Sequence, residues 1–246
     1  MGSNKTLIFG HRGAAGTAPE NTMVSFQAAL GSGAEGIELD VQLTKDGVPV
    51  VVHDEKLNRT TDGHGWVKDF ALAEIKTLDA GSWFSEGFSG ERIPTLKETV
   101  HWAKATNLLL NIEFKTAYIP YKGIEKAVID CIKAFDMENR VILSSFNHYS
   151  LIRAHEYAPN IETAVLFMEK LVSPGSYASK INARSLHPYW PIVDEVLLDE
   201  TNKLKMAVRP FTVNEEAAIK QLIEKGCSAI ITDFPAKAVQ IRENIE

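Results

Sequence analysis

Short β-rich runs alternate with helical patterns along almost the whole chain, and this alternation restricts the fold more than any other feature. The β-rich runs lie at residues 7–11, 36–42, 108–114, 141–146, 162–167, 183–186, 206–211 and 229–232. Helical patterns follow at about 22–30, 95–105, 123–135, 150–157, 193–203, 215–225 and 236–244. Eight strands mostly separated by helices favour an α/β fold, a (β/α)8 TIM barrel, over an open doubly wound sheet. No Gly-x-Gly-x-x-Gly follows the first run, so the dinucleotide-binding fold loses its main support.

One segment interrupts the alternation. The run at 48–53 follows the tight-turn pair Asp46-Gly47, which predicts a β-hairpin with the preceding strand. Residues 54–95 are rich in glycine and polar side chains, with a short helix expected at 71–78. Trp83, Phe84 and Phe88 are expected to form the core of this segment, and the alternative is that they belong to an exposed apolar rim. We interpret this segment as a small cap inserted between the second and third β/α units of a single barrel domain spanning 1–246. The connection at 168–182 has a weak pattern and is expected to be short or irregular.

Composition excludes several classes of protein. The 246 residues suit one barrel domain, and a formal net charge of −6 argues against a dedicated nucleic-acid binder. No run approaches the roughly 20 apolar residues of a membrane span, so stable membrane insertion is not expected. Two cysteines are too few for a disulfide framework, which favours a reducing, cytoplasmic location. Composition leaves the choice between a monomer and a dimer open.

Acidic residues lie on two consecutive strands of the expected barrel. Glu38 and Asp40 are two residues apart on a strand and therefore share one face, and Glu113 lies near the end of the next barrel strand. Such a set of oxygen ligands predicts one divalent cation, Mg²⁺ or Ca²⁺ rather than Zn²⁺. The alternative is a buried salt-bridge network in which the same acids pair with Arg12 and Lys115.

Two histidines differ from the others because each ends a strand beside a charged neighbour. His11 precedes Arg12, and His53 precedes Asp54. Histidine titrates near neutrality, so one ring can accept a proton while the other donates one, and we predict that His11 and His53 are an acid–base pair. Arg12 offers a planar fork of donors suited to a phosphate, and Lys115 adds a point charge.

The remaining histidines carry weaker signals. His187 ends a strand before Pro188 and is a candidate for lining a substrate pocket. The other four histidines are interpreted as packed or solvated side chains: His64, His101, His148 and His155.

An ordered set of motifs resembles the glycerophosphodiester phosphodiesterase family, in its bacterial, cytosolic form. The matches run along nearly the whole chain: His11-Arg12-Gly13, Ala18-Pro19-Glu20-Asn21-Thr22, Glu38-Leu39-Asp40-Val41, Thr44-Lys45-Asp46-Gly47, His53-Asp54, Leu57 with Arg59-Thr60-Thr61, Ile93-Pro94-Thr95-Leu96, Glu113-Phe114-Lys115, Ser144-Ser145-Phe146-Asn147, Thr212-Val213-Asn214 and Thr232-Asp233-Phe234-Pro235. Each motif alone is weak, whereas the ordered set is highly specific.

The resemblance implies a capped barrel that hydrolyses glycerophosphodiesters, such as glycerophosphocholine or glycerophosphoethanolamine, to sn-glycerol 3-phosphate and an alcohol. It implies a metal held by Glu38, Asp40 and Glu113 and acid–base catalysis by His11 and His53. The family can form a cyclic phosphate before water attacks, and the sequence does not choose between that route and direct hydrolysis.

The resemblance also extends to residues around the site. Arg12 and Lys115 would lie near the phosphate, while Glu20 and Asn21 would support the site, although Asn21 could equally cap the following helix. Phe211 stands where the family often has Trp, which keeps an aromatic pocket wall.

Two other functions remain compatible with the same site. A lysophospholipase D-like or other phospholipid phosphodiesterase should carry an exposed apolar rim or a basic membrane face. A non-catalytic barrel that binds anions or metals should lack one of the histidines or acids, and all of them are present here.

Overall fold

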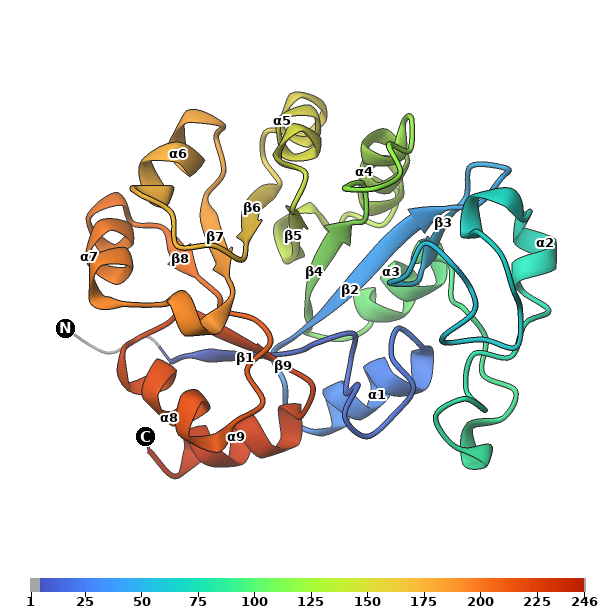
Figure 1. Cartoon of the computed structure of the whole chain (residues 1–246), viewed down its shortest axis with the longest axis horizontal. Coiled ribbons are helices and arrows are strands. Elements are labelled where there is room, and N and C mark those ends of the chain that lie inside the picture. The colour runs from blue at the N-terminus through green and yellow to red at the C-terminus, as the bar shows by residue number, and fades with distance from the viewer. Residues whose placement is uncertain (1–4, 246) are drawn as a thin grey trace.

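A computed structural model describes residues 5–245, and their strands form one sheet that curves into a barrel (Figure 1). The strands are β1 (Leu7–Gly10), β2 (Gly36–Leu43), β3 (Pro49–Val51), β4 (Leu109–Phe114), β5 (Val141–Ser145), β6 (Glu162–Phe167), β7 (Ser185–Pro188), β8 (Ala207–Val208) and β9 (Ala229–Thr232). The path β8-β7-β6-β5-β4-β2-β1-β9 is parallel throughout, and β3 pairs antiparallel with β2. The predicted (β/α)8 TIM barrel and its hairpin arm are confirmed.

The two end strands of this path are joined by backbone hydrogen bonds. The Ser228 N–H donates to Val208 O at 2.9 Å, and the Ile231 N–H donates to Pro210 O at 3.0 Å. Strand β8 is much shorter than the run expected at 206–211, because Pro210 has no N–H with which to continue the ladder. These contacts join the seventh and eighth barrel strands and close the barrel, while β9 pairs with β1 on its other side.

Helices cover the outside of the barrel (Figure 1). They are α1 (Met23–Gly31), α3 (Leu96–Lys104), α4 (Ile124–Lys133), α5 (His148–Tyr157), α6 (Pro174–Lys180), α7 (Glu195–Leu204), α8 (Glu216–Glu224) and α9 (Pro235–Glu243). Short 3-10 turns lie at Glu138–Arg140 and Trp190–Ile192. The connection at 168–182, expected to be short or irregular, contains helix α6, so that expectation is wrong. Within residues 5–245, no helix combines the length and the apolar character needed to cross a membrane.

Strand β2 is buried along its whole length, with one face toward the outer helices and the other toward the barrel interior. Its apolar residues, with Leu39 as an example, pack outward against Phe26 of α1 and Leu96 of α3. Its polar residues alternate with them and therefore point into the barrel. At the start of β2, the interior is filled by the Phe9 ring. A Cβ on Gly36 would lie 2.5 Å from that ring, so only glycine fits there.

The insertion between β3 and α3 has its own hydrophobic cluster. It contains α2 (Leu72–Ile75) and 3-10 turns at Val67–Asp69 and Glu86–Phe88. The buried members of the cluster are Val50, Val52, Leu57, Val67, Ile75, Ala80 and Ile93. Trp83, Phe84 and Phe88, expected to form this core, lie outside it and pack edge to face on one another, with Trp83 39% exposed. The prediction that these three rings form the core of the insertion is therefore wrong.

A buried arginine ties the opposite, N-terminal end of the barrel together. Arg242 of α9 is 1% exposed and donates to Thr6 O and to Glu35 Oε2, both at 2.8 Å. Glu35 Oε2 also accepts from the Ile8 N–H at 2.9 Å, so one carboxylate joins α9 to β1.

We predict that Arg242→Ala lowers the free energy of unfolding by about 2–4 kcal/mol, because it leaves Glu35 without its main partner and opens a cavity. Urea unfolding measures the change. Arg184→Ala, which removes an exposed arginine, is the matched control and should stay within about 0.5 kcal/mol of the wild type. Equal stabilities of the two variants would contradict the prediction.

Candidate active site

Three buried carboxylates converge at the C-terminal ends of β2 and β4. Asp40 is directly opposite Glu113 in the parallel register, and Glu38 lies one inward position earlier on β2. Oxygen atoms of Glu38, Asp40 and Glu113 all lie within 4.8 Å of one another. The structure therefore brings together the three acids that the sequence predicted as metal ligands.

Two cations lie against these acids, as the salt-bridge alternative expected. Arg12 Nε is 3.3 Å from Asp40 Oδ2, and the Arg12 backbone N–H donates to Glu38 Oε2 at 3.0 Å. Lys115 Nζ is 2.9 Å from Glu113 Oε1 and 3.7 Å from Asp40 Oδ1. The acids nevertheless outnumber these cations, so the ion pairs do not balance the site.

The pKa values of the three acids reflect both burial and this excess of negative charge. Burial raises the pKa of Glu38 well above its usual range, and the charges of Asp40 and Glu113 raise it further. Burial also raises the pKa of Glu113 to about 7, against the pull of Lys115. For Asp40, burial acts in the same direction, but Arg12 and Lys115 outweigh it and hold the pKa below its ordinary value. An additional positive charge would lower the pKa values of Glu38 and Glu113.

The donor atoms fit a hard divalent cation. All three acidic ligands are oxygen donors, the type that Mg²⁺ and Ca²⁺ prefer. Asn111 follows the same inward face of β4 and lines one small cavity with His11, Glu38 and Glu113. Its Oδ1 atom is buried and has no hydrogen-bond partner among the described residues. A neutral oxygen without a partner beside the carboxylates suits a cation or a water bound to it.

His11 is held by residues from the far end of the chain. Its Nδ1 lies 2.7 Å from Asp233 Oδ1, and its Nε2 is 3.9 Å from Glu38 Oε2. Asp233 is fixed in turn by Asn214, whose Nδ2 donates to Asp233 Oδ2 at 2.6 Å. A carboxylate on Nδ1 orients the ring and leaves Nε2 facing the acids.

His53 has the same arrangement with its neighbour in the chain. Its Nδ1 lies 2.6 Å from Asp54 Oδ1, which again leaves Nε2 available. Burial lowers the pKa of His53, with help from Arg12 and Lys115 and against the attraction of Asp40 and Asp54. A lowered pKa keeps this imidazole neutral near pH 7, the form that accepts a proton.

Glu20 and Asn21 both support the predicted site. Glu20 Oε1 accepts from Arg12 Nη1 at 2.8 Å. Asn21 Nδ2 donates to Asp40 Oδ2 at 2.8 Å, while Thr22, not Asn21, caps α1 by accepting from the Ser25 N–H. The helix-cap alternative for Asn21 is therefore wrong.

His187 and Phe211 occupy different depths. His187 is fully buried, with Nδ1 3.5 Å from Asn111 Nδ2 and Nε2 3.4 Å from Arg209 Nη1. Burial and the charge of Arg209 lower the pKa of His187 well below its ordinary value, so the ring is neutral. Phe211 lines the cavity of His11 and Glu38 and packs edge to face on Phe146.

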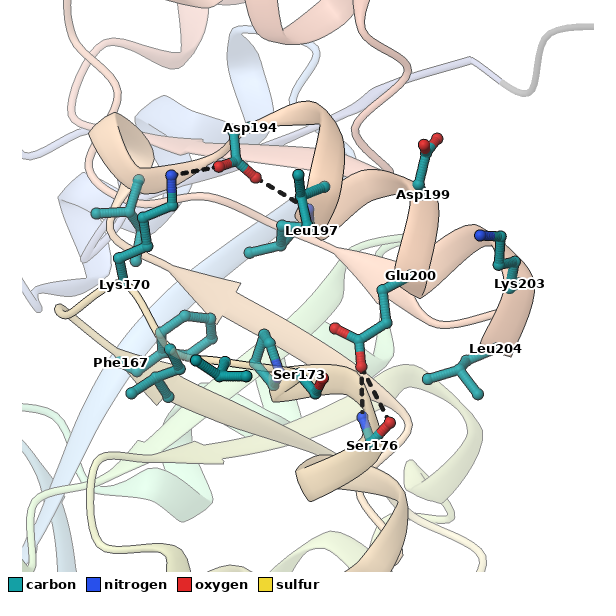
Figure 2. A pocket seen from close by; sticks show the side chains of 15 residues that line it. Phe167, Lys170, Ser173, Ser176, Asp194, Leu197, Asp199, Glu200, Lys203 and Leu204 are labelled. Atoms are coloured by element: carbon teal, nitrogen blue, oxygen red, sulfur yellow. Dashed lines mark hydrogen bonds and ion pairs between the residues drawn. The ribbon is translucent and has the colours of Figure 1, made fainter.

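A large groove lies elsewhere on the described chain. It has a volume of about 890 Å³ and lies between the loop after β6 and helix α7, with Lys170, Asp194 and Glu200 among its lining residues (Figure 2). Leu166 faces the cavity of His11 and Glu38, and the next residue, Phe167, faces this groove, so β6 itself separates the two. The groove is no part of the candidate site.

The sequence interpretation gave no role to Asp233, Asn214 or Arg59, although all three lie in quoted motifs. Asp233 directly follows β9, and β9 pairs with β1, so barrel closure was the signal that could have placed it beside His11. Arg59 lies in the insertion, and no periodicity predicts its contacts.

Comparisons with known proteins find relatives that match nearly the whole chain. The model of the Glycerophosphoryl diester phosphodiesterase family matches residues 11–237. A glycerophosphodiester phosphodiesterase of Caldanaerobacter subterraneus subsp. tengcongensis is 45% identical over 237 residues, 96% of this chain and 98% of that protein. One from Bacillus altitudinis is 45% identical over 244 residues, 98% of this chain and 100% of that protein.

A solved structure is also similar along its whole length. The Oleispira antarctica phosphodiesterase in complex with the product sn-glycerol-3-phosphate has a TM-score of 0.89 and 31% sequence identity. The match covers 97% of this chain and 97% of that chain.

We predict that metal-free protein loses stability as the pH rises, in part through Glu113. Its pKa of about 7 in the folded state exceeds the unfolded value of about 4.3, so its contribution is complete below about pH 4 and lost as the pH passes through 7. Glu113→Gln should remove up to about 3 kcal/mol of this decline. Urea unfolding in EDTA at pH 5 and pH 8 measures it.

Glu156→Gln, which changes an exposed glutamate of α5, is the control and should keep the decline of the wild type. Parallel pH profiles for Glu113→Gln and the wild type would show that Glu113 does not titrate as expected.

Proposed function

Because the chain belongs to the glycerophosphoryl diester phosphodiesterase family and is therefore a hydrolase, we propose that it cleaves small glycerophosphodiesters at the Glu38, Asp40 and Glu113 site. The proposed products are sn-glycerol 3-phosphate and an alcohol such as choline or ethanolamine. The observation that carries the proposal is the pair of carboxylate-oriented histidines beside one cluster of oxygen ligands.

The proposed cofactor is one divalent cation, Mg²⁺ or Ca²⁺, held by Glu38, Asp40 and Glu113. When bound, it would polarise the phosphoryl oxygens and stabilise negative charge. The raised pKa values of Glu38 and Glu113 support this assignment, because a cation would favour the ionised forms of both.

His11 and His53 are proposed to move the protons. Cleavage needs a base on the attacking oxygen and an acid on the leaving alkoxide. The lowered pKa of His53 supports the role of base for this ring at neutral pH, which leaves His11 to protonate the leaving group. The attacking oxygen is either water or the glycerol hydroxyl, and both routes need the same two rings.

Arg12 and Lys115 are proposed to bind the phosphate. Burial alone would lower the pKa of each, but the neighbouring carboxylates raise both, so both groups stay charged. Phe211 supports a pocket wall for the substrate together with Phe146. His187 lies one layer deeper, where its contact with Asn111 supports an indirect role below the substrate.

The substrate is proposed to be a small molecule, as the Oleispira product complex supports for a related enzyme. We propose the cytoplasm as the compartment, supported by the two free cysteines, Cys131 and Cys227.

A second candidate substrate, a lysophospholipid, is favoured by one observation. Exposed apolar side chains follow the C-terminal ends of β4, β5, β6, β7 and β9: Tyr118, Phe146, Tyr149, Met168, Tyr189 and Phe234. Such a rim could contact an acyl chain, because tyrosine and aliphatic side chains suit a lipid–water boundary.

We predict metal-dependent release of glycerol 3-phosphate from glycerophosphocholine, followed with a coupled dehydrogenase after EDTA treatment and after Mg²⁺ or Ca²⁺ is restored. His11→Ala and His53→Ala should each lower kcat by about 10²- to 10⁴-fold, because each removes one proton carrier. His101→Ala, which changes an exposed histidine of α3, should leave kcat unchanged.

The substrates are compared in parallel assays. Release from lysophosphatidylcholine alone would replace the first candidate substrate with the second. If folded, metal-loaded protein releases product from neither substrate, the proposed hydrolysis is contradicted and a binding role is favoured.

A further inference from the structure

One side chain of the insertion contacts the partners of both His53 and Arg12. That side chain is Arg59, which lies in the cap, outside the barrel strands. We propose that Arg59 is a positioning residue that fixes His53 and Arg12 relative to each other through Asp54 and Glu20. This inference rests on the proposed function, in which these two residues act on the same phosphodiester.

All three nitrogen atoms of the Arg59 guanidinium group donate hydrogen bonds to these two carboxylates. Toward Asp54, its Nε donates to Oδ2 at 2.7 Å and its Nη2 to Oδ1 at 3.0 Å. Toward Glu20, its Nη1 donates to Oε2 at 2.7 Å and its Nη2 to Oε1 at 2.8 Å. Two bidentate contacts from one planar group fix both carboxylates in direction as well as distance, which a lysine cannot do.

The same carboxylates hold the two proposed functional side chains. Asp54 Oδ1 lies 2.6 Å from His53 Nδ1, and Glu20 Oε1 accepts from Arg12 Nη1 at 2.8 Å. Arg59 Nη2 contacts both of these shared oxygen atoms. A rotation of His53 or Arg12 therefore either breaks its own contact to the shared oxygen atom or pulls that oxygen away from Arg59 Nη2.

A purely structural role explains these contacts less well. The insertion already has its own buried cluster, and Val50 and Val52 at β3 tie that cluster to the barrel. The Arg59 side chain is 44% exposed, where a single ion pair contributes little to stability. What the network adds is orientation, and a misplacement of about 1 Å at a catalytic group can cost about 10²-fold in rate.

We predict that Arg59→Ala lowers kcat/KM for glycerophosphocholine by about 10- to 100-fold. Arg59→Lys keeps the positive charge but cannot make two bidentate contacts, so it should recover only a minor part of the lost kcat/KM. Arg92→Ala, which removes an exposed arginine of the same insertion, is the matched control and should stay within about twofold of the wild type. Urea unfolding of every variant reports whether the fold is kept.

A second readout does not depend on activity. The charged groups around His53 are Asp54, Asp40, Arg12 and Lys115, and Arg59 offsets the charge of Asp54. Loss of Arg59 should therefore raise the pKa of His53, measured by NMR of its imidazole, and Arg59→Lys should return it toward the wild-type value.

The outcomes separate this inference from the proposed function. If the wild type is active and the kcat/KM of Arg59→Ala is within about twofold of the wild-type value, the positioning role is overturned and the proposed function stands. An inactive wild type would contradict the function, and the NMR titration would then decide the inference alone. An unchanged pKa of His53 in Arg59→Ala would overturn it.

Discussion

The structure of the site depends on the crowding of like charges at one end of the barrel. Three carboxylates lie within 4.8 Å of one another, and Arg12 and Lys115 are one charge short of balancing them. Burial raises the pKa values of Glu38 and Glu113, and the negative charges of their neighbours raise both further. A divalent cation would convert the deficit of one positive charge into an excess of one, which matches the single negative charge of a phosphodiester. The same electrostatic imbalance thus accounts for both the proposed metal and the proposed substrate.

The barrel can hold such a costly arrangement because the strands fix it. The parallel register places Asp40 opposite Glu113, and neither can move without shifting a buried strand. The loop after β1 is equally constrained, since Arg12 and Asn21 both adopt positive φ values, 50° and 56°. Left-handed backbone is unfavourable for arginine and persists only where the surroundings enforce it, as is common at functional sites. Strain and charge repulsion are both maintained by the packing of the rest of the fold.

The sequence predicted what depends on local pattern and missed what depends on distant contacts. Alternation along β2 was enough to place Glu38 and Asp40 on one face, and the strand count was enough for the barrel. The Asp233–His11 contact joins residues more than two hundred positions apart and arises only when β9 pairs with β1. Helix α6 begins Pro-Gly-Ser, with weak helical propensity, and its Gly175 lies close against Leu204 of α7, so tertiary packing decides it. The need of an inserted segment to bury a core of its own predicts a buried Trp83, but local pattern does not show that smaller side chains fill that core instead.

The two histidines have the same local chemistry but are held by different parts of the molecule. His11 is oriented by Asp233 and Asn214, which lie just after β9 and β8, so its position follows from closure of the barrel. His53 is oriented by Asp54, whose pKa is lowered to about 2 by hydrogen bonds from Arg59 and His53 that outweigh the effect of burial. One ring is therefore tied to the rigid scaffold and the other to the insertion. Because an insertion can change in length and sequence without disturbing the barrel, substitutions there can adjust His53 while His11 and the carboxylates stay in place.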